Sequence, residues 1–403
     1  MTDRGVPWRV AMVLGIAQLG FATVIPLLPL HLTERLGASV RLVGVVVATV
    51  ALVETFFKTA WGGVSDRFGP RPVMIAGCVL SSIAPLVMSV LTVPILFVPL
   101  RLLDGLGSAA LLPAAAAAIA TATTPRQRTS GMALLNMFFL IGLGLGPVLG
   151  LFVAGAAGDF RAGFYLASAL LAAAGALAVL TFPRSRPREE PDAHIGYHTS
   201  LHPARLRAVV LGFRLSPQLA SLYLSAFVQM FGVGLLVPIA AIYARRVLGL
   251  SEQAIGIVLF ALVMAVAVAS LPAGRLADRV GKMRLIVVGM VPGTIGMWLI
   301  PFSGRFWLLI FAGALLGVSY ALWAPAWLAL VSELAPPGNL GLAVGASETV
   351  QGLGLVLGPL LGGVLWDALG PRAPFIASAV ILTLGTLIAA RSLKVDPERA
   401  TSA

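Results

Sequence analysis

Charged residues are scarce in this sequence, because Asp, Glu, Lys and Arg make up only 11% of its 403 residues. A soluble globular domain carries about 25%. The chain is 59% hydrophobic, with a mean hydropathy of +0.97. A membrane-spanning helix needs about 20 mostly apolar residues, so a chain of this length accommodates about twelve spans with short connections. Too little polar sequence remains for a soluble domain of ordinary size.

Cysteine and histidine are also rare. Cys78 is the only cysteine, which excludes an internal disulfide and a zinc site of several thiolates. His194, His198 and His202 recur every four residues and would share one face of a helix, where they could bind a metal. Gly196 and Pro203 disfavour a helix there, so we expect no metal and no cofactor.

Motifs for enzymatic chemistry are missing as well. The sequence contains no phosphate-binding P-loop, no metalloprotease helix motif and no Gly-x-Ser-x-Gly nucleophile elbow. A membrane-embedded enzyme would need a nucleophile, a base or a metal cluster converging within the spans, and the four histidines fall outside a central cavity. We therefore expect that the chain is not an enzyme and does not use an ATPase of its own.

Negative charge is in short supply, and the formal net charge is +12. Such a balance can indicate nucleic-acid binding. The basic residues, however, lie in the short gaps between apolar blocks, where the positive-inside rule places them. The sequence predicts a lipid bilayer as partner, and no nucleic acid.

Long apolar blocks make up most of the chain. Backbone polar groups in lipid must be satisfied internally, so each block is expected to be a helix. The first block runs directly into further spans and has no cleavage site, which favours a helix over a removable signal peptide. The blocks are 8–32, 41–64, 73–92, 94–120, 131–156, 162–183, 215–243, 252–274, 285–302, 306–331, 341–366 and 373–391.

The distribution of Lys and Arg predicts the orientation. With the N-terminus inside, the inner segments hold 19 of the 28 basic residues and the outer segments hold seven, while Lys58 and Arg101 lie within spans. Both termini are therefore expected in the cytoplasm. Abundant alanine, and arginine far in excess of lysine, indicate a GC-rich prokaryote and hence a cytoplasmic membrane.

The sequence repeats itself at a constant offset of 212 residues. Coincidental Gly and Pro matches are common in membrane helices, but a single ungapped offset across several helices indicates duplication. The sequence predicts an all-α polytopic membrane protein of twelve spans in two pseudo-symmetric six-helix bundles, 1–183 and 215–403, joined by a polar cytoplasmic loop, 184–214. The matching pairs include Gly20 with Gly232, Pro26 with Pro238, Asp66 with Asp278, Gly69 with Gly281, Pro113 with Pro325 and Gly146-Pro147 with Gly358-Pro359.

A glycine- and charge-rich motif follows the second apolar block and recurs after the eighth. Glycines permit a tight turn, and Asp and Arg can lock neighbouring helix ends through charge and dipole. The first copy resembles the loop motif G-x-L-a-D-r-x-G-r-r of the major facilitator superfamily. That resemblance implies a latch on the cytoplasmic side; the alternative is a topogenic turn with a solvated Asp-Arg pair. Pro70 and Met283 depart from the motif. The motif residues are Gly62, Asp66, Arg67, Gly69 and Arg71, and then Gly274, Asp278, Arg279 and Gly281.

Two further motifs resemble those of proton-coupled antiporters in the superfamily. Gly142, Gly146, Pro147 and Gly150 in the fifth block are similar to G-x-x-x-G-P-x-x-G-G, with Leu151 in place of the last glycine. As structure alone, small residues four apart permit close helix packing, and a proline bends the helix.

The fourth block carries the second of these motifs. Arg101, followed by Asp104 and Gly105, is similar to R-x-x-Q-G-x-g-a-A of drug–proton antiporters, with Asp where Gln is usual. The resemblance implies that Arg101 takes part in proton transfer. Alternatively, the two side chains lie three apart on one helical face and simply neutralise each other.

Ionisable groups at membrane depth are costly, at about 2.5–3.5 kcal/mol each at the centre, so each is a functional candidate. Glu54 and Lys58, four apart, could form an internal ion pair. Glu348 has no charged neighbour on its own helix; in an apolar cavity it would favour its protonated form, or it could act as a conformational lock. The candidates for proton coupling are Glu54, Arg101, Asp104 and Glu348.

Aromatic residues with a few polar groups are expected to line a central cavity, which suits bulky hydrophobic or cationic compounds. For any single residue, helix packing or lipid contact is an equal alternative. The cavity candidates are Gln18, Phe21, Glu54, Asn136, Phe139, Gln229, Phe231, Tyr320, Trp323 and Gln351.

Together these patterns predict a secondary transporter that works by alternating access, as a monomer, on a small-molecule substrate with protons as the coupling ion. Efflux of hydrophobic or cationic drug-like compounds is the favoured function. A transporter of the same fold for a metabolite, sugar or lysolipid remains the alternative, because it would share every fold-level feature.

Overall fold

The computed structural model describes residues 5–182, 217–335 and 340–392. The predicted loop 184–214, with its three histidines, lies outside these residues. Within them every regular element is helical. The first six spans contain α1 Val6–Leu30, α2 Val40–Phe68, α3 Pro70–Val90, α4 Phe97–Ala122, α5 Pro125–Ala157 and α6 Phe160–Thr181. The rest comprise α8 Pro217–Leu236, α9 Ala240–Arg246, α10 Glu252–Val280, α11 Lys282–Leu299, α12 Phe306–Leu334, α13 Leu340–Leu369 and α14 Ala373–Ser392.

The prediction of a polytopic all-α membrane protein is confirmed. Among the described residues, twelve helical segments are long and apolar enough to cross a membrane. Two short 3-10 turns, η2 Pro94–Leu96 and η3 Ile300–Phe302, precede α4 and follow α11, and the π turn η1 His31–Arg35 ends the first span.

Several helices extend beyond the apolar blocks from which they were predicted. The second block ends near residue 64, but α2 continues to Phe68, and α5 begins at Pro125 instead of near 131. Polar residues at these ends continue the helix because the backbone hydrogen bonds of a helix do not depend on apolar side chains. Thr124 and Gln127 form a capping box that fixes the start of α5.

The same proline has a different effect on the helix in the two copies of the repeat. Pro26 lies inside α1, which passes through it without a break. At the equivalent Pro238 the seventh span turns, so that α8 ends at Leu236 and α9 begins at Ala240. Proline removes one backbone donor in either place, and the neighbouring packing decides whether the helix tolerates the loss.

The chain forms two compact units, which do not follow the order of the sequence. The first contains Met1–His202, Gly234–Phe260 and Leu355–Pro371. The second contains Pro203–Val233, Ala261–Gly354 and Arg372–Ala403. Helix ends from the second repeat thus belong to the first unit. The division of the chain into halves on either side of 184–214 rests on the repeat in the sequence.

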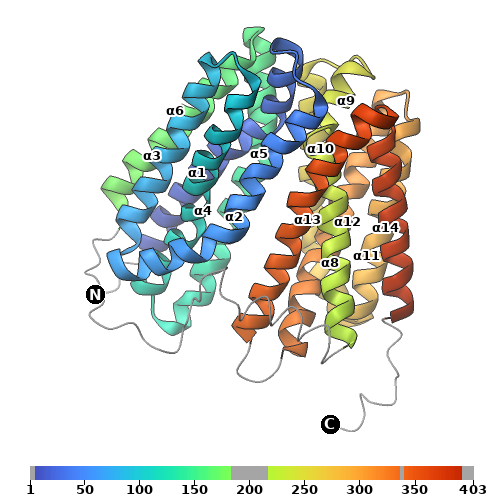
Figure 1. The fold of residues 1–403 in the computed structure, drawn as a ribbon. Helices are drawn as coiled ribbons and strands as arrows, with labels where there is room; N and C mark the ends of the chain where they lie inside the picture. The colour runs from blue at the N-terminus through green and yellow to red at the C-terminus, as the bar shows by residue number, and fades with distance from the viewer. Residues whose placement is uncertain (1–4, 183–216, 336–339, 393–403) are drawn as a thin grey trace. The chain divides into compact units, whose positions relative to one another are not determined.

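Glycines allow α5 to pack directly on the backbone of α1 (Figure 1). A Cβ atom at Gly142 would lie 2.5 Å from the carbonyl oxygen of Gly15, and one at Gly146 would lie 2.6 Å from that of Leu19. A Cβ atom at Gly150 would lie 2.8 Å from the carbonyl oxygen of Thr23. The three glycines are one helical turn apart and so form one continuous strip of contact.

The second repeat conserves this packing in part. A Cβ atom at Gly354 would lie 3.0 Å from the carbonyl oxygen of Phe227, which is the residue equivalent to Gly15. Gly362, the equivalent of Gly150, similarly contacts the carbonyl oxygen of Leu235. The glycine motif of the fifth block therefore has a direct packing role in both copies.

We predict that Gly146→Ala lowers the thermal stability of the purified protein, because its methyl group meets the α1 backbone. Overpacking of this kind costs about 1–3 kcal/mol. Gly63→Ala is the matched control, since a Cβ atom at Gly63 has no neighbour within 4 Å. Thermal unfolding in detergent should show a lower Tm for Gly146→Ala alone; equal Tm values for both variants would contradict the packing.

Candidate functional site

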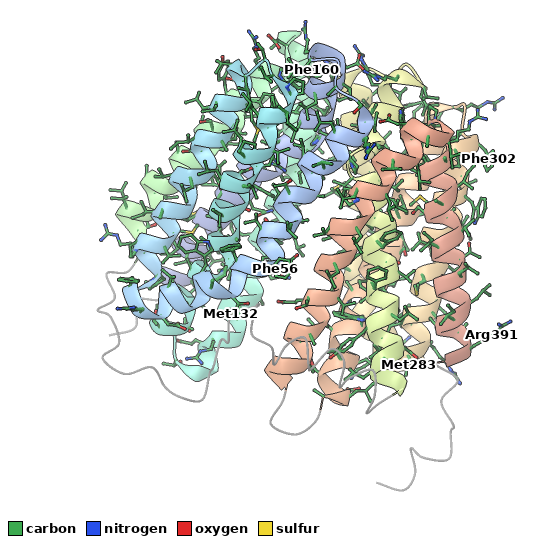
Figure 2. The ribbon with its side chains drawn as sticks, viewed as in Figure 1. Phe56, Met132, Phe160, Met283, Phe302 and Arg391 are labelled. Carbon is green, nitrogen blue, oxygen red and sulfur yellow. The ribbon has the colours of Figure 1, made fainter. Side chains whose placement is uncertain are left out.

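Four side chains on α2 and α4 form a polar cluster within the first unit: Glu54, Arg101, Asp104 and Ser108, here named the acidic cluster. The two helices pack closely at Gly105, where a Cβ atom would lie 2.9 Å from the Cβ atom of Val53. This close approach brings Glu54, the next residue of α2, against α4. Figure 2 labels Phe56 on the same helix, between Phe160 and Met132 along the length of the unit.

Arg101 and Asp104 form a buried ion pair. Their Nη1 and Oδ2 atoms are 2.5 Å apart, and the side chains are 5% and 1% exposed. The spacing of three residues on α4 allows this pairing, which was the alternative to a role of Arg101 in proton transfer. Among the described residues, Arg101 Nε and Asp104 Oδ1 have no hydrogen-bond partner, so the pair satisfies its charges but not all of its polar atoms.

Glu54 is held by a residue that the sequence analysis did not select. The Ser108 hydroxyl donates a hydrogen bond of 2.7 Å to Glu54 Oε1. No ion pair joins Glu54 to Lys58 within the described part of the chain, although both side chains belong to it. Ser108 lies one turn beyond Asp104, so its spacing on α4 was the available signal.

The charges of the acidic cluster do not balance. With every group ionised, two carboxylates face a single guanidinium, and within the described part of the chain Lys58 makes no ion pair with them. An excess negative charge is expensive in a low-dielectric environment, so binding one proton or one cation would lower the electrostatic energy. A proton and a cationic compound would therefore compete for the same charge.

Two of the cavity candidates on α1 are buried in the first unit. The ring of Phe21 lies 5.9 Å from the guanidinium carbon of Arg101, which joins it to the acidic cluster. Gln18 is buried on the α5-facing side of α1, next to Gly142. On α5, Phe139 is half-buried and Asn136 is exposed.

The remaining cavity candidates lie in the second unit, and two of them belong to aromatic stacks. Phe231 stacks on Phe227 with ring centroids 5.6 Å apart, and Trp323 stacks on Trp327 at 5.5 Å. Trp323 is fully buried, and its indole nitrogen has no partner among the described residues. The Trp323 stack is therefore part of the packed interior of the second unit.

The other polar candidates of the second unit differ in exposure. Gln229 is buried, Gln351 is half-buried and Tyr320 is exposed. Glu348 is exposed as well, so the described residues do not enclose it in an apolar pocket. The structure thus gathers Glu54, Arg101 and Asp104 into one cluster in the first unit, whereas Glu348 belongs to the second unit.

The repeated motif is mostly helical, not a loop as expected. Residues Gly62 to Phe68 form the last turns of α2, and the turn itself is a single glycine, Gly69. Gly69 and its equivalent Gly281 both have φ of +88°, a conformation that glycine adopts far more readily than other residues.

Charged residues flank both turns. The guanidinium of Arg67 lies over the ring of Phe68, and Arg71 donates a hydrogen bond to the Val179 carbonyl at the end of α6. In the second copy, Lys282 pairs with Glu333 of α12. Gly274 and Asp278 lie within α10, whose backbone is described there, while the Asp278 side chain lies outside the described set.

A profile of the Major Facilitator Superfamily matches residues 10–219 and 222–402. The chain belongs to this superfamily. Similar proteins include Multidrug resistance protein 2 of Bacillus subtilis (strain 168), which is 26% identical over 92% of this chain and 90% of the relative. Multidrug resistance protein MdtG of Salmonella paratyphi C (strain RKS4594) is 28% identical over 96% of this chain and 95% of the relative.

Solved structures agree on the fold. The crystal structure of nucleoside transporter NupG superimposes with a TM-score of 0.79, covering 97% of this chain and 100% of that one, at 13% sequence identity. The major facilitator fold predicted from the motifs and the repeat is thereby confirmed.

In this superfamily member we predict that Arg101→Met is strongly destabilising, and increasingly so as the pH rises. Removing one partner of a buried ion pair costs about 3–5 kcal/mol, and at low pH a proton can neutralise the remaining Asp104 carboxylate. The double variant Arg101→Met/Asp104→Leu should recover most of the loss, because it leaves no unpaired charge. Thermal unfolding of both variants between pH 5 and 9 measures this. A double variant no more stable than Arg101→Met would contradict mutual neutralisation.

Proposed function

We propose that this chain exports hydrophobic or cationic drug-like compounds in exchange for protons. The observation that carries the proposal is the excess negative charge of the acidic cluster, which one proton or one cationic compound can neutralise. Competition between two ligands for one charge is what antiport requires. The names of the similar multidrug resistance proteins support drug-like substrates, and the glycine motif of α5 supports antiport.

In this mechanism Glu54 carries the proton. Asp104 is already neutralised by Arg101, whereas among the described residues Glu54 accepts a hydrogen bond only from the neutral Ser108 hydroxyl, so its charge remains to be balanced. Protonation of Glu54 would release a cationic substrate, and binding of the substrate would expel the proton. Phe21, whose ring lies 5.9 Å from the guanidinium carbon of Arg101, would contribute apolar contact for the rest of the substrate.

We further propose that the protein acts as a monomer in the cytoplasmic membrane of a prokaryote, with both termini in the cytoplasm. The excess of Lys and Arg in the inner segments supports this orientation. It places Gly69 and Gly281 at the cytoplasmic ends of their helices, where the motif residues around Asp66 and Asp278 would latch the inner side.

We expect substrate-driven proton movement to depend on Glu54. Purified protein in liposomes, with an imposed pH gradient and a trapped pH-sensitive dye, should dissipate the gradient when cationic dyes or drugs are added. Glu54→Gln should reduce this response at least about tenfold, because the neutral amide cannot exchange a proton. Glu348→Gln removes an exposed carboxyl and is the matched control.

Loss of the response in Glu348→Gln but not in Glu54→Gln would contradict the proposed role of Glu54 and identify Glu348 as the proton carrier. If the folded protein responded to no compound in the panel, drug–proton exchange would be wrong, and a dedicated metabolite or lipid carrier would replace it.

We expect Asp66→Asn to lower turnover on the order of tenfold, which equals about 1.4 kcal/mol. Folding and membrane insertion should persist, because the asparagine side chain removes the charge of the latch but has a similar shape. Asp159→Asn is the control, since asparagine also caps the start of α6 well. Transport rates in liposomes at matched protein content measure both variants. Normal turnover in Asp66→Asn would contradict the proposed latch.

A further inference from the structure

Glu34 and Arg246 form an ion pair between the first and seventh spans, which belong to different repeats. Arg246 Nε donates to Glu34 Oε1 at 2.6 Å, and Arg246 Nη2 donates to the Thr33 carbonyl oxygen at 2.6 Å. All three residues lie in the first compact unit. This set of contacts is here named the clasp.

The clasp residues occupy equivalent positions in the two repeats. Glu34 and Arg246 are separated by 212 residues, the offset of the duplication. A contact between equivalent positions joins the two repeats directly, and the Glu34–Arg246 ion pair is such a contact. A faithful duplication would place two like charges there, and these would repel; instead one copy is acidic and the other basic.

The end of the first span provides a second attraction for Arg246. The last carbonyl groups of a helix lack helical partners and carry partial negative charge. The first span ends in the π turn His31–Arg35, and its Thr33 carbonyl accepts the hydrogen bond from Arg246. A single guanidinium thus binds a carboxylate and a helix terminus together, which a shorter or neutral side chain cannot do.

Backbone contacts around the clasp also join the repeats. The Arg41 N–H donates a 2.9 Å hydrogen bond to Asp367 Oδ2, and a Cβ atom at Gly363 would lie 2.6 Å from the Val40 carbonyl oxygen. Gly44 contacts the Pro359 carbonyl in the same way. The start of α2 and the second part of α13 therefore meet backbone to backbone.

The ion pair is accessible to water, since the Arg246 and Glu34 side chains are 40% and 29% exposed. Solvent-exposed pairs contribute little to stability and exchange readily with water. The clasp is thus suited to a contact that forms and breaks repeatedly, unlike the buried pair of Arg101 and Asp104.

We propose that Arg246 is a positioning residue for alternating access, and that the clasp holds the two repeats together at the extracellular side. The assignment rests on the proposed function and orientation, because rocking of one repeat against the other must separate every contact between them at the opening end. Span ends opposite the Gly69 and Gly281 turns are extracellular in that orientation. Breaking the clasp favours the state that is open to the outside.

The test measures distance across the clasp with pairs of spin labels. Cys78 is buried and is the only cysteine, so a Cys78→Ala background accepts labels at Leu36→Cys and Val247→Cys without other reactive thiols. In lipid nanodiscs, without substrate or pH gradient, the background should show mainly a short distance. Arg246→Gln should raise the longer-distance population about fivefold, in line with a modest exposed interaction.

A neighbouring arginine provides the matched control. Arg245 lies beside Arg246 but bonds to the Leu250 carbonyl and lies 3.5 Å from Glu252, both within its own repeat. Arg245→Gln removes the same charge and should leave the distance distribution unchanged. The exchange Glu34→Arg with Arg246→Glu rebuilds the ion pair but not the Thr33 contact, and should restore the short distance in part.

Three results would overturn the proposal: an unchanged distribution in Arg246→Gln, an equal shift in Arg245→Gln, or no recovery in the charge exchange. Should Arg246→Gln fail to fold, Glu34→Gln replaces it, with a smaller shift expected in the same direction because the Thr33 contact persists. The distances are measured without a drug or a gradient. The distance measurement therefore tests the clasp even if the protein transports no drug. A negative result for the clasp does not contradict drug–proton exchange, which the liposome assay tests separately.

Discussion

The ion pair between Arg101 and Asp104 is the interaction on which the site depends. Either charge alone is costly at membrane depth, and together on α4 they remain buried, at 5% and 1% exposure. Because Asp104 is already neutralised, the second carboxyl of the cluster, Glu54, is left with a neutral hydroxyl as its partner. The proposed exchange of a proton for a cation at Glu54 rests on this arrangement.

Duplication explains the scaffold but not the chemistry. Glycine strips bring α5 onto α1 and α13 onto the seventh span. They recur at the offset of 212 residues because in both copies the two helices pack backbone to backbone. The acidic cluster does not recur. Val266, Gly313, Leu316 and Tyr320 stand where the first repeat has Glu54, Arg101, Asp104 and Ser108. The ionisable cluster therefore belongs to one repeat, while the equivalent positions of the other are apolar or aromatic.

Much of the fold follows from hydropathy and the repeat. Twelve apolar blocks predicted twelve spans, because lipid forces the backbone to satisfy its own hydrogen bonds. Helix ends were predicted less well: α2 continues through its charged residues to Phe68, so the repeated motif is helical up to a single-glycine turn. The break at Pro238 was not predicted either, since the equivalent Pro26 leaves α1 intact.

The sequence by itself determined the membrane class, the number of spans and the duplication, because hydropathy and repetition can be read along the chain. For Arg101 and Asp104 it offered pairing as one of two alternatives, and the structure shows the ion pair. Only the tertiary structure decided that Ser108 bonds Glu54, that Glu348 is exposed and that Arg246 meets Glu34. Those facts depend on how separate helices approach one another. That approach is set by glycine contacts and side-chain packing between segments far apart in the chain, which no local pattern encodes.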